Sequence, residues 1–428
     1  MQESYKIINH MTVTSLASQG ISSLGNFLTV VLLAKALTPD DFGLYMMFST
    51  AFMIVSGISA SLVKMPLKVL GAGITEKDAS SYFSSQLSLQ IIFVFFILLA
   101  GGIFLLTKPL FSLGLAAAFF FYLMSADLQD FMRSANMTRF KWKKLFTADI
   151  ITHVCRITLI LMLLWMKNVS LIHVLLIIGI TYLAGFLISP LGGVHYQINL
   201  HNIANIWRIN WKFGKWLLLE TILYTVSTQI YIYFIALGVD IFSAGAFAAA
   251  QTLLNSFNVV QIGLMNYAIP VARKYLIETG YNEWRRWLMN VGIILFSVSL
   301  IFCAVISIFA KPLLSILFKP IYGKFYYLVP ILSIAIILVS INTVLSAAFR
   351  TAEFPEAGFW GKLVSAIVTI GLGYPMILKW GIIGAGLGIV FTQICWIIVN
   401  LSYVFFTNTL REKRISSRII KINNISNY

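Results

Sequence analysis

Polar residues able to bind a ligand recur at helical spacing inside apolar segments of this chain. In the first segment they step by three and four residues, which places them on one face of a helix: Ser15, Gln19, Ser22, Asn26 and Thr29. Two later segments carry comparable stripes, one with Glu220 and Tyr224, the other with Gln251, Asn255 and Asn258. Polar side chains on apolar helices face protein or water, so the stripes predict a water-filled cleft. Hydrogen bonding between packed helices is the alternative, since the same residue types join helices in lipid.

Four cations lie within or at the ends of apolar segments and could attract an anion: Lys64, Arg133, Arg156 and Arg350. Arg156 is the deepest, and a charge at the centre of a bilayer costs about 3 kcal/mol on insertion scales. Its alternative role is structural, as the partner of Asp149, Asp127 or Asp130. Arg133 and Arg350 each end a polar stripe with i, i+4, i+8 spacing, which begins at Ser125 and at Asn342 respectively.

No group of residues has the spacing of a catalytic or metal site. The five histidines lie apart from carboxylates and cysteines at ligand spacing, and the three cysteines are far from one another. Asp127, Asp130 and Glu220 could take up protons if desolvated, but they lie near predicted helix ends, where we expect partial solvation. We therefore expect no enzyme activity, no cofactor and no metal.

The amino-acid composition indicates that these residues lie in segments that cross a membrane. Hydrophobic residues make up 59% of the 428 residues and charged residues 11%, against about a quarter charged in soluble domains. Charge-free runs of about 20 residues, enough to cross a bilayer, recur along the chain. The sequence predicts an all-α polytopic membrane protein whose first apolar segment is a retained helix, because a signal-peptide cleavage pattern is not evident.

About twelve spans are predicted from these runs, near 9–34, 42–63, 84–106, 110–132, 147–166, 172–193, 216–237, 243–269, 288–309, 325–349, 361–378 and 382–406. They divide into two six-helix lobes, 1–200 and 201–410, followed by a basic tail, 411–428. A shift of 202 residues aligns Ala34, Gly43 and Thr50 with equivalent residues of the second half, and a shift of 217 aligns Arg133 with Arg350. An even number of helices per half makes such a repeat parallel, with a pseudo-twofold axis along the membrane normal.

Positive charge predicts the orientation. Most of the 31 Lys and Arg residues fall in connections on the side of the N-terminus, and few fall in the opposite ones. Positively charged short loops stay cytoplasmic, so both termini are expected inside. The net charge of +16 then suits anionic headgroups of membrane lipids and argues against nucleic acid, because it is spread over loop rims. The opposite connections are short, the longest running from Ala310 to Lys324, which leaves no room for an external catalytic domain.

The segment Leu33-Ala34-Lys35-Ala36-Leu37-Thr38-Pro39-Asp40-Asp41-Phe42-Gly43-Leu44-Tyr45 resembles the first hairpin of bacterial polysaccharide exporters, the Wzx-type flippases of the multidrug/oligosaccharidyl-lipid/polysaccharide (MOP) superfamily. The stretch from Phe131 to Asp149 is similar to that family's fourth-helix exit, and Phe349-Arg350 to its counterpart in the second half. The resemblance implies a V-shaped MOP/MATE-like transporter in the bacterial inner membrane that works by alternating access. It implies that undecaprenyl-diphosphate-linked oligosaccharide, an O-antigen or capsule repeat unit destined for lipopolysaccharide or a related polysaccharide, is turned from the cytoplasmic to the periplasmic leaflet. Other membrane proteins of polysaccharide assembly are its implied partners.

The resemblance also suggests roles for the polar residues. Arg133 and Arg350 match the family's helix-end pattern, and with Arg156 and Lys64, chosen by depth and sign, they are candidates to bind the diphosphate, since arginine forks fit phosphate oxygens. The candidate glycan contacts are the cleft-lining residues Gln19, Asn26, Glu220, Tyr224, Gln251, Asn255 and Asn258.

Other functions stay open at the level of sequence. A cation-coupled multidrug exporter of the same superfamily would need carboxylates deep in a lobe, whereas the acids here cluster near helix ends. A membrane-embedded glycan polymerase, ligase or acyltransferase would need a larger external loop. A scaffold or a channel is a further alternative, and the driving force of a transporter could be an ion gradient, the membrane potential or consumption of the product.

Overall fold

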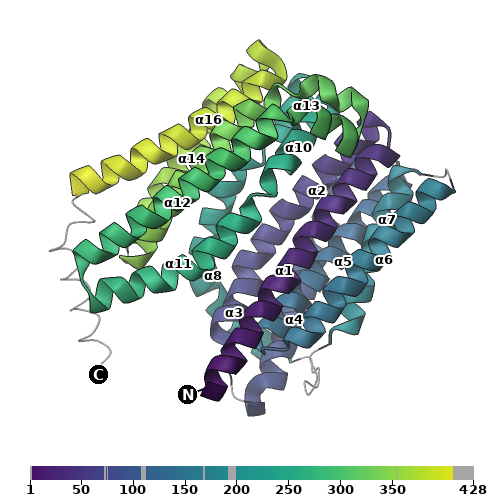
Figure 1. Ribbon diagram of the computed structural model, residues 1–428. Helices are drawn as coiled ribbons and strands as arrows, with labels where there is room; N and C mark the ends of the chain where they lie inside the picture. The colour runs from purple at the N-terminus through teal and green to yellow at the C-terminus, as the bar shows by residue number, and fades with distance from the viewer. Residues whose placement is uncertain are drawn as a thin grey trace. The chain divides into compact units, whose positions relative to one another are not determined.

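The computed structural model of the protein describes residues 2–71, 74, 76–107, 112–166, 169–190, 199–352 and 354–407. The regular elements in these ranges are helices (Figure 1). The predicted basic tail, 411–428, lies outside them. The chain forms two compact units, Met1–Ile222 and Leu223–Tyr428, whereas the sequence predicts a boundary at residue 200.

The first unit contains α1 (Gln2–Ala36), α2 (Pro39–Ser59), α3 (Met65–Leu70), α4 (Glu76–Thr107), α5 (Leu113–Thr138), α6 (Trp142–Trp165), α7 (Leu171–Ile188) and most of α8 (Leu200–Thr228). A π-helical turn, Ala60–Lys64, joins α2 to α3 without ending the helix. Within this unit α5 packs on α7, and α6 packs on both α1 and α7 (Figure 1).

The tight connection between α1 and α2 follows from local chemistry. The Thr38 hydroxyl accepts a hydrogen bond from the backbone N–H of Asp41, which satisfies one of the unpaired donors at the helix start. Pro39 has the backbone angle of a first helical residue, and Asp40 and Asp41 place negative charge at the positive end of the helix dipole. These four residues belong to the segment that resembles the first hairpin of polysaccharide exporters. Their role in starting α2 gives a structural reason for that sequence motif.

The start of α8 is held by the first unit, which accounts for the later boundary. Asn210 and Gln86 of α4 exchange two side-chain hydrogen bonds, at 2.9 and 3.1 Å. Gly214 lies so close to α2 that an added Cβ would come within 2.4 Å of the Ser61 carbonyl oxygen. Nearer its end, Thr221 shares a hydrogen bond of 2.9 Å with the Ser61 hydroxyl.

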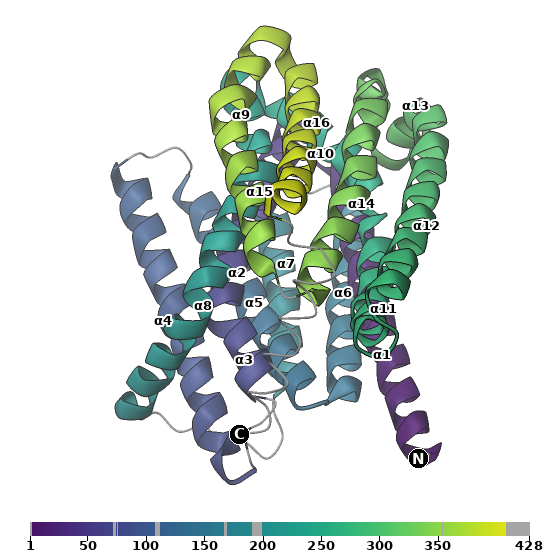
Figure 2. The same ribbon diagram turned by 90° about the vertical axis from the view of Figure 1, so that its left-hand side faces the viewer.

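The second unit contains the end of α8, α9 (Tyr231–Gly238), α10 (Ile241–Asn255), α11 (Asn258–Glu278), α12 (Tyr281–Ile308), α13 (Ala310–Leu313), α14 (Leu328–Thr351), α15 (Pro355–Val368) and α16 (Tyr374–Thr407). Two predicted spans are broken: α8 and α9 bend by 41°, and α10 and α11 are interrupted at Ser256 and Phe257. Helices α12, α14 and α16 lie side by side, with α15 against α16 (Figures 1 and 2).

The last predicted pair of spans forms a hairpin whose first arm is α15, a π-helical turn (Thr369–Gly373) and the start of α16, and whose second arm is the rest of α16. Gly381 interrupts the helix with φ 58° and ψ −142°, a conformation that favours glycine, and the chain turns back there (Figure 2). The two arms are in close contact, because a Cβ on Gly384 would lie 2.1 Å from the Met376 carbonyl oxygen.

Length and composition alone give fewer spans than the twelve predicted. Seven helical segments of the described residues are long and apolar enough to cross a membrane, or eight if the bent pair of α8 and α9 is one span. One of the seven, Gly358–Tyr403, has 46 residues and includes the Gly381 hairpin. Helices α1 and α5, which carry polar stripes, are outside the count.

Candidate functional site

A cavity of about 470 Å³ in the second unit brings together several of the predicted polar residues. Helices α8, α11, α14, α15 and α16 each contribute to its wall. Arg350, Tyr224 and Asn258, all predicted from the sequence, line it together with Lys362 and Trp396. The volume falls in the range of small-molecule pockets, roughly 300–1,000 Å³.

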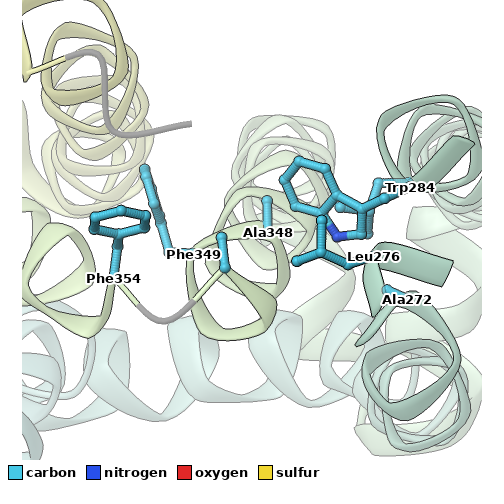
Figure 3. Packing of buried hydrophobic residues seen from close by; sticks show 8 residues of the cluster. Ala272, Leu276, Trp284, Ala348, Phe349 and Phe354 are labelled. Atoms are coloured by element: carbon cyan, nitrogen blue, oxygen red, sulfur yellow. The ribbon is translucent and has the colours of Figure 1, made fainter. Parts of the chain in front are cut away.

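Arg350 is directed by the packing of its neighbours. Ala348 and Phe349 belong to a buried cluster with Leu276 and Trp284 (Figure 3). Because these two residues bury one side of the last turn of α14, Arg350 is presented on another side, where it lines the cavity. The turn is also tied at Thr351, whose hydroxyl accepts a hydrogen bond of 3.1 Å from the Trp284 indole N–H.

Lys362 is held between two aromatic rings. Its ammonium nitrogen lies 5.8 Å from the ring centre of Tyr224 and 5.9 Å from that of Trp396, within the range of cation–π attraction. The neighbouring Gly361 makes this approach possible, because a Cβ there would lie 2.3 Å from Cδ1 of Trp396. The close contact of α15 with α16 therefore sets the position of the second cation.

The rest of the lining combines polar and apolar side chains. Amides and hydroxyls come from Asn258, Gln261, Gln393, Thr343 and Ser346. Apolar side chains come mainly from α11, through Ile262, Met265 and Ile269, on the same helix face as Asn258. Gln261 and Gln393 are fixed by neighbours, since Gln261 donates to the Ser340 hydroxyl at 2.8 Å and Gln393 accepts from Asn342 at 3.0 Å.

Two basic side chains line the cavity. Arg350 and Lys362 line it, and none of the described lining residues is a carboxylate. In a wall of low dielectric such charges act strongly on a ligand. The cavity is therefore suited to an anion that also has an apolar part.

In the first unit, Lys64 lies in a buried ion cluster formed with Asp127, Asp130, Ser56 and Gln90. Its ammonium nitrogen is 2.8 Å from Asp127 and 2.5 Å from Asp130, and it donates to the Ser56 hydroxyl at 2.9 Å. Gln90 donates to the second oxygen of Asp127. The side chains of Lys64 and Asp127 are 1% and 0% exposed, so the expected solvation of Asp127 is wrong: α5 continues to Thr138 and places this acid well inside the helix.

Arg133 forms a second ion pair of the first unit, with Asp149 of α6. The closest approach is 2.9 Å, and Nη2 of the arginine donates to the other carboxylate oxygen at 3.1 Å. Ser22 and Ser18 of α1 complete the group, since Ser22 accepts from Arg133 and Ser18 donates to Asp149. Ser22 of the predicted α1 stripe, together with Ser18 outside it, therefore joins helices, as the alternative interpretation proposes.

Arg156 is 2% exposed and pairs with none of the three acids named as its alternative partners. Asp149 is occupied by Arg133, and Asp127 and Asp130 by Lys64. The guanidinium lies 4.1 Å from the ring centre of Tyr182 and donates to Thr181 and Asn26, each at 3.3 Å. Its Nη2 has no hydrogen-bond partner among the described residues.

The remaining predicted residues lie apart from these groups. Gln19 is exposed on α1 and Asn26 contacts Arg156. Glu220 is half-buried on α8 within the first unit, and Gln251 and Asn255 of α10 are outside the cavity lining. A cleft shared by the two halves stays a prediction from the sequence.

Lys362, Gln393 and Trp396 are among the cavity residues that sequence reasoning missed. The predicted span begins at residue 361, which places Lys362 at its end, but α15 begins at Pro355 and places the lysine two turns inside a helix. Gln393 and Trp396 are three residues apart in an apolar helix, and Asn400 follows on the same face. That polar spacing was the signal available. No cluster of metal ligands occurs in the described part of the chain.

No protein-family model and no curated protein matches the sequence. Solved structures do match. An inward-facing multidrug resistance MATE family transporter of the MOP superfamily is 14% identical over 91% of this chain and 95% of its own, with a TM-score of 0.77. An outward-facing MATE family transporter of the same superfamily is 13% identical over 94% and 96%, with a TM-score of 0.63. A MOP superfamily transporter from Pyrococcus furiosus is 12% identical over 94% and 96%, also with a TM-score of 0.63.

These likenesses define the fold of the protein. The chain is all-helical and has the fold of MATE transporters of the MOP superfamily, which confirms the fold class predicted from the sequence. With its apolar helices it is a multi-pass membrane protein.

Proposed function

We propose that the protein is a membrane transporter that turns undecaprenyl-diphosphate-linked oligosaccharide from the cytoplasmic to the periplasmic leaflet of a bacterial inner membrane. The observation that carries this proposal is the cavity of the second unit, where Arg350 and Lys362 line the same wall as amides and aromatic rings. A diphosphate needs cations, and arginine binds phosphate oxygens through a planar, permanently charged fork.

The glycan adds a second requirement. Each unpaired hydroxyl moved into hydrocarbon costs roughly 4–8 kcal/mol, so the glycan needs a hydrated polar path. Exposed or half-buried polar residues of the predicted stripes are candidates for that path: Gln19, Asn26 and Glu220 in the first unit and Gln251 and Asn255 in the second. Arg156, a buried cation without an ion-pair partner among the described residues, is a candidate attractor for anionic groups.

Three carboxylates of the first unit argue against a cation-coupled multidrug exporter. Asp127, Asp130 and Asp149 are each in an ion pair with a lysine or arginine of the same unit. A cation-coupled multidrug exporter, the alternative considered from the sequence, would use such carboxylates to bind its cation. Here each of the three carboxylates already has a cationic partner, although Asp127 and Asp130 share Lys64.

Deletion of the gene tests the proposal directly. In a strain without paralogues, lipid-linked repeat units should accumulate on the inner leaflet, and mass spectrometry of extracted lipids should identify them. Reintroducing the gene should restore export, whereas the Arg350→Ala variant should restore it only weakly. Normal export in the deletion strain, with increased sensitivity to cationic drugs, would refute the oligosaccharide substrate and support the multidrug alternative.

A further inference from the structure

The connection between α5 and α6 holds an aromatic residue in a strained backbone conformation. Phe140 has φ 53°, and it is the only non-glycine residue of the described chain with a positive φ. Its backbone N–H bonds to the Met137 carbonyl oxygen at 3.1 Å, and that of Lys141 bonds to the Asn136 carbonyl oxygen at 2.9 Å. This pattern ends a helix with one residue in the left-handed region, where glycine is usual because a side chain crowds the backbone.

The ring of Phe140 is not placed there by the hydrophobic core. The residue is 59% exposed, and its ring lies 6.4 Å from that of Trp142, measured between the ring centres. A strained conformation persists only where surrounding contacts stabilise it, and the protein itself covers less than half of this side chain. The strain therefore points to a contact of the exposed ring with a molecule outside the chain.

Basic residues flank the exposed ring. The short segment that contains it has four cations: Arg139, Lys141, Lys143 and Lys144. The wider stretch from Phe131 to Thr147 contains no Asp or Glu, and none of the four cations forms an ion pair with a residue that the structure describes. Their charge is therefore available to an anionic ligand.

Two of these cations are fixed by neighbouring elements. The Lys144 ammonium donates to the carbonyl oxygen of Pro190, after α7, at 2.8 Å. The Arg139 guanidinium lies 5.9 Å from the ring centre of Phe83 in α4, within the range of cation–π attraction. Lys141 and Lys143 are exposed. The connection is thus a basic surface attached to its neighbours at two points, with two lysines and one aromatic ring exposed on it.

We propose that the α5–α6 connection binds the headgroup of an anionic phospholipid, with Lys141 and Lys143 at the phosphate and the Phe140 ring among the adjoining acyl chains. The connection lies on the side that loop charge predicts to be cytoplasmic, and aromatic residues favour the interface between lipid and water. There each Lys or Arg near an anionic leaflet strengthens binding about fivefold. A soluble acidic partner would match the lysines but would gain little from the phenyl ring. The site does not depend on the transported substrate.

Quenching of Trp142 fluorescence by brominated lipids tests the site, because this indole adjoins Phe140. The full-length protein would be placed in bilayers of phosphatidylcholine and phosphatidylglycerol, with bromine on the acyl chains of one lipid at a time. The Trp142 signal is the difference between the wild type and a Trp142→Phe variant. Phosphatidylglycerol should be preferred about fivefold or more at this residue, and the preference should fall at high salt, because exposed charges are screened.

Variants separate the charge from the ring. Lys141→Gln/Lys143→Gln should bring the preference for phosphatidylglycerol close to one. Phe140→Gly should weaken the quenching of Trp142 by both lipids without lowering the melting temperature, because glycine suits the left-handed backbone. Arg285→Gln/Arg286→Gln is the matched control: it removes two exposed cations near the start of α12 and should leave the preference unchanged.

Equal quenching by the two lipids in the wild type would overturn the proposal. A loss of preference in the α12 control as large as that in Lys141→Gln/Lys143→Gln would also overturn it, since the attraction would then come from net charge alone. If the wild type shows no lipid preference but binds polyglutamate through the two lysines, the connection recognises an acidic polypeptide instead. A lower melting temperature of Phe140→Gly would show that the ring supports the fold and not the lipid contact.

Discussion

Lys64 and Arg156 are both almost completely buried in the first unit, and their surroundings are opposite in kind. Lys64 is within 2.8 Å of two carboxylates, so removing it would leave Asp127 and Asp130 uncompensated. Arg156 has an aromatic ring, a hydroxyl and an amide as neighbours but no carboxylate partner among the described residues. Breaking a buried ion pair is costly, whereas replacing an unpaired buried charge by an apolar side chain is not. We therefore expect Lys64 to stabilise the fold and Arg156 to serve a role other than stability.

We expect Lys64→Met to destabilise the protein by roughly 3–5 kcal/mol, the cost of an uncompensated buried charge. The free energy of unfolding in detergent would be measured by denaturant titration. Adding Asp127→Asn and Asp130→Asn to the same variant should recover much of the loss, because it removes the unpaired charges. Lys274→Gln breaks only an exposed pair with Glu278 and should change stability by less than about 1 kcal/mol. A stable Lys64→Met single variant would contradict the structural role.

For Arg156→Met we expect the opposite combination, with stability retained or increased and export reduced. The substitution keeps much of the volume and removes a buried charge that has no ion pair among the described residues. Export of lipid-linked units and the free energy of unfolding would both be measured on the same variant. A loss of stability similar to that of Lys64→Met would show that Arg156 supports the fold instead.

At the scale of helices, interruptions of regular geometry determine where side chains are presented. The π-helical turn of α2 contains Lys64, and such turns are frequent at functional sites. In the second unit Gly361 lets α15 approach Trp396, and Gly381 and Gly384 allow the hairpin of α16. The hairpin brings Gln393 and Trp396 to the cavity wall. Small residues at these contacts are thus requirements of helix packing.

Gly384→Ala should disrupt this hairpin. The added Cβ would meet backbone atoms of Met376 at 2.1 and 2.5 Å, which cannot move aside as a flexible side chain can, so we expect a loss of about 1–3 kcal/mol or more. Gly358→Ala in α15 is the matched control, because nothing lies within 4 Å of its Cβ and alanine favours the helix. Thermal unfolding of the two variants would be compared, and equal stability would argue against close contact of the arms.

At the scale of the whole molecule, corresponding positions of the two units carry an arginine in different surroundings. Arg133 of α5 and Arg350 of α14 coincide under a shift of 217 residues. Arg133 is paired with Asp149 inside the first unit, whereas Arg350 lines the cavity of the second. At these matching positions the first unit therefore has an arginine in an ion pair, and the second has an arginine that lines a cavity.

The charge distribution predicts that both termini are cytoplasmic. A fluorescent protein fused after Tyr428 should fluoresce, and alkaline phosphatase at the same place should be inactive. The reverse pattern is expected for reporters inserted after Asn168, in a connection of the opposite side. An active phosphatase at the C-terminus would mean that the orientation is inverted and that Arg350 and Lys362 face the other leaflet.

Much of the architecture could be predicted because it depends on local sequence. Apolar runs located the helices, although α2 begins at Pro39, three residues before the predicted span. The ends were less accurate: α5 extends to Thr138 and α15 begins at Pro355, since amphipathic turns continue past the apolar core of a span. That error placed Asp127 and Lys362 near solvent. Of the candidate residues, Arg350, Tyr224 and Asn258 are brought together, which spacing on separate helices could not reveal.

The sequence by itself determined the solvent, the helical class and the expected orientation of this protein, because hydrophobicity and loop charge act residue by residue. Only the tertiary structure decided which charges are compensated. Lys64 with Asp127 and Asp130, and Arg133 with Asp149, are pairs between different helical segments. Their formation leaves Arg156 without an acidic partner among the residues that the structure describes. Which cation pairs with which carboxylate depends on which helices pack together and on how they are aligned along their axes. The sequence of a single segment does not contain that information.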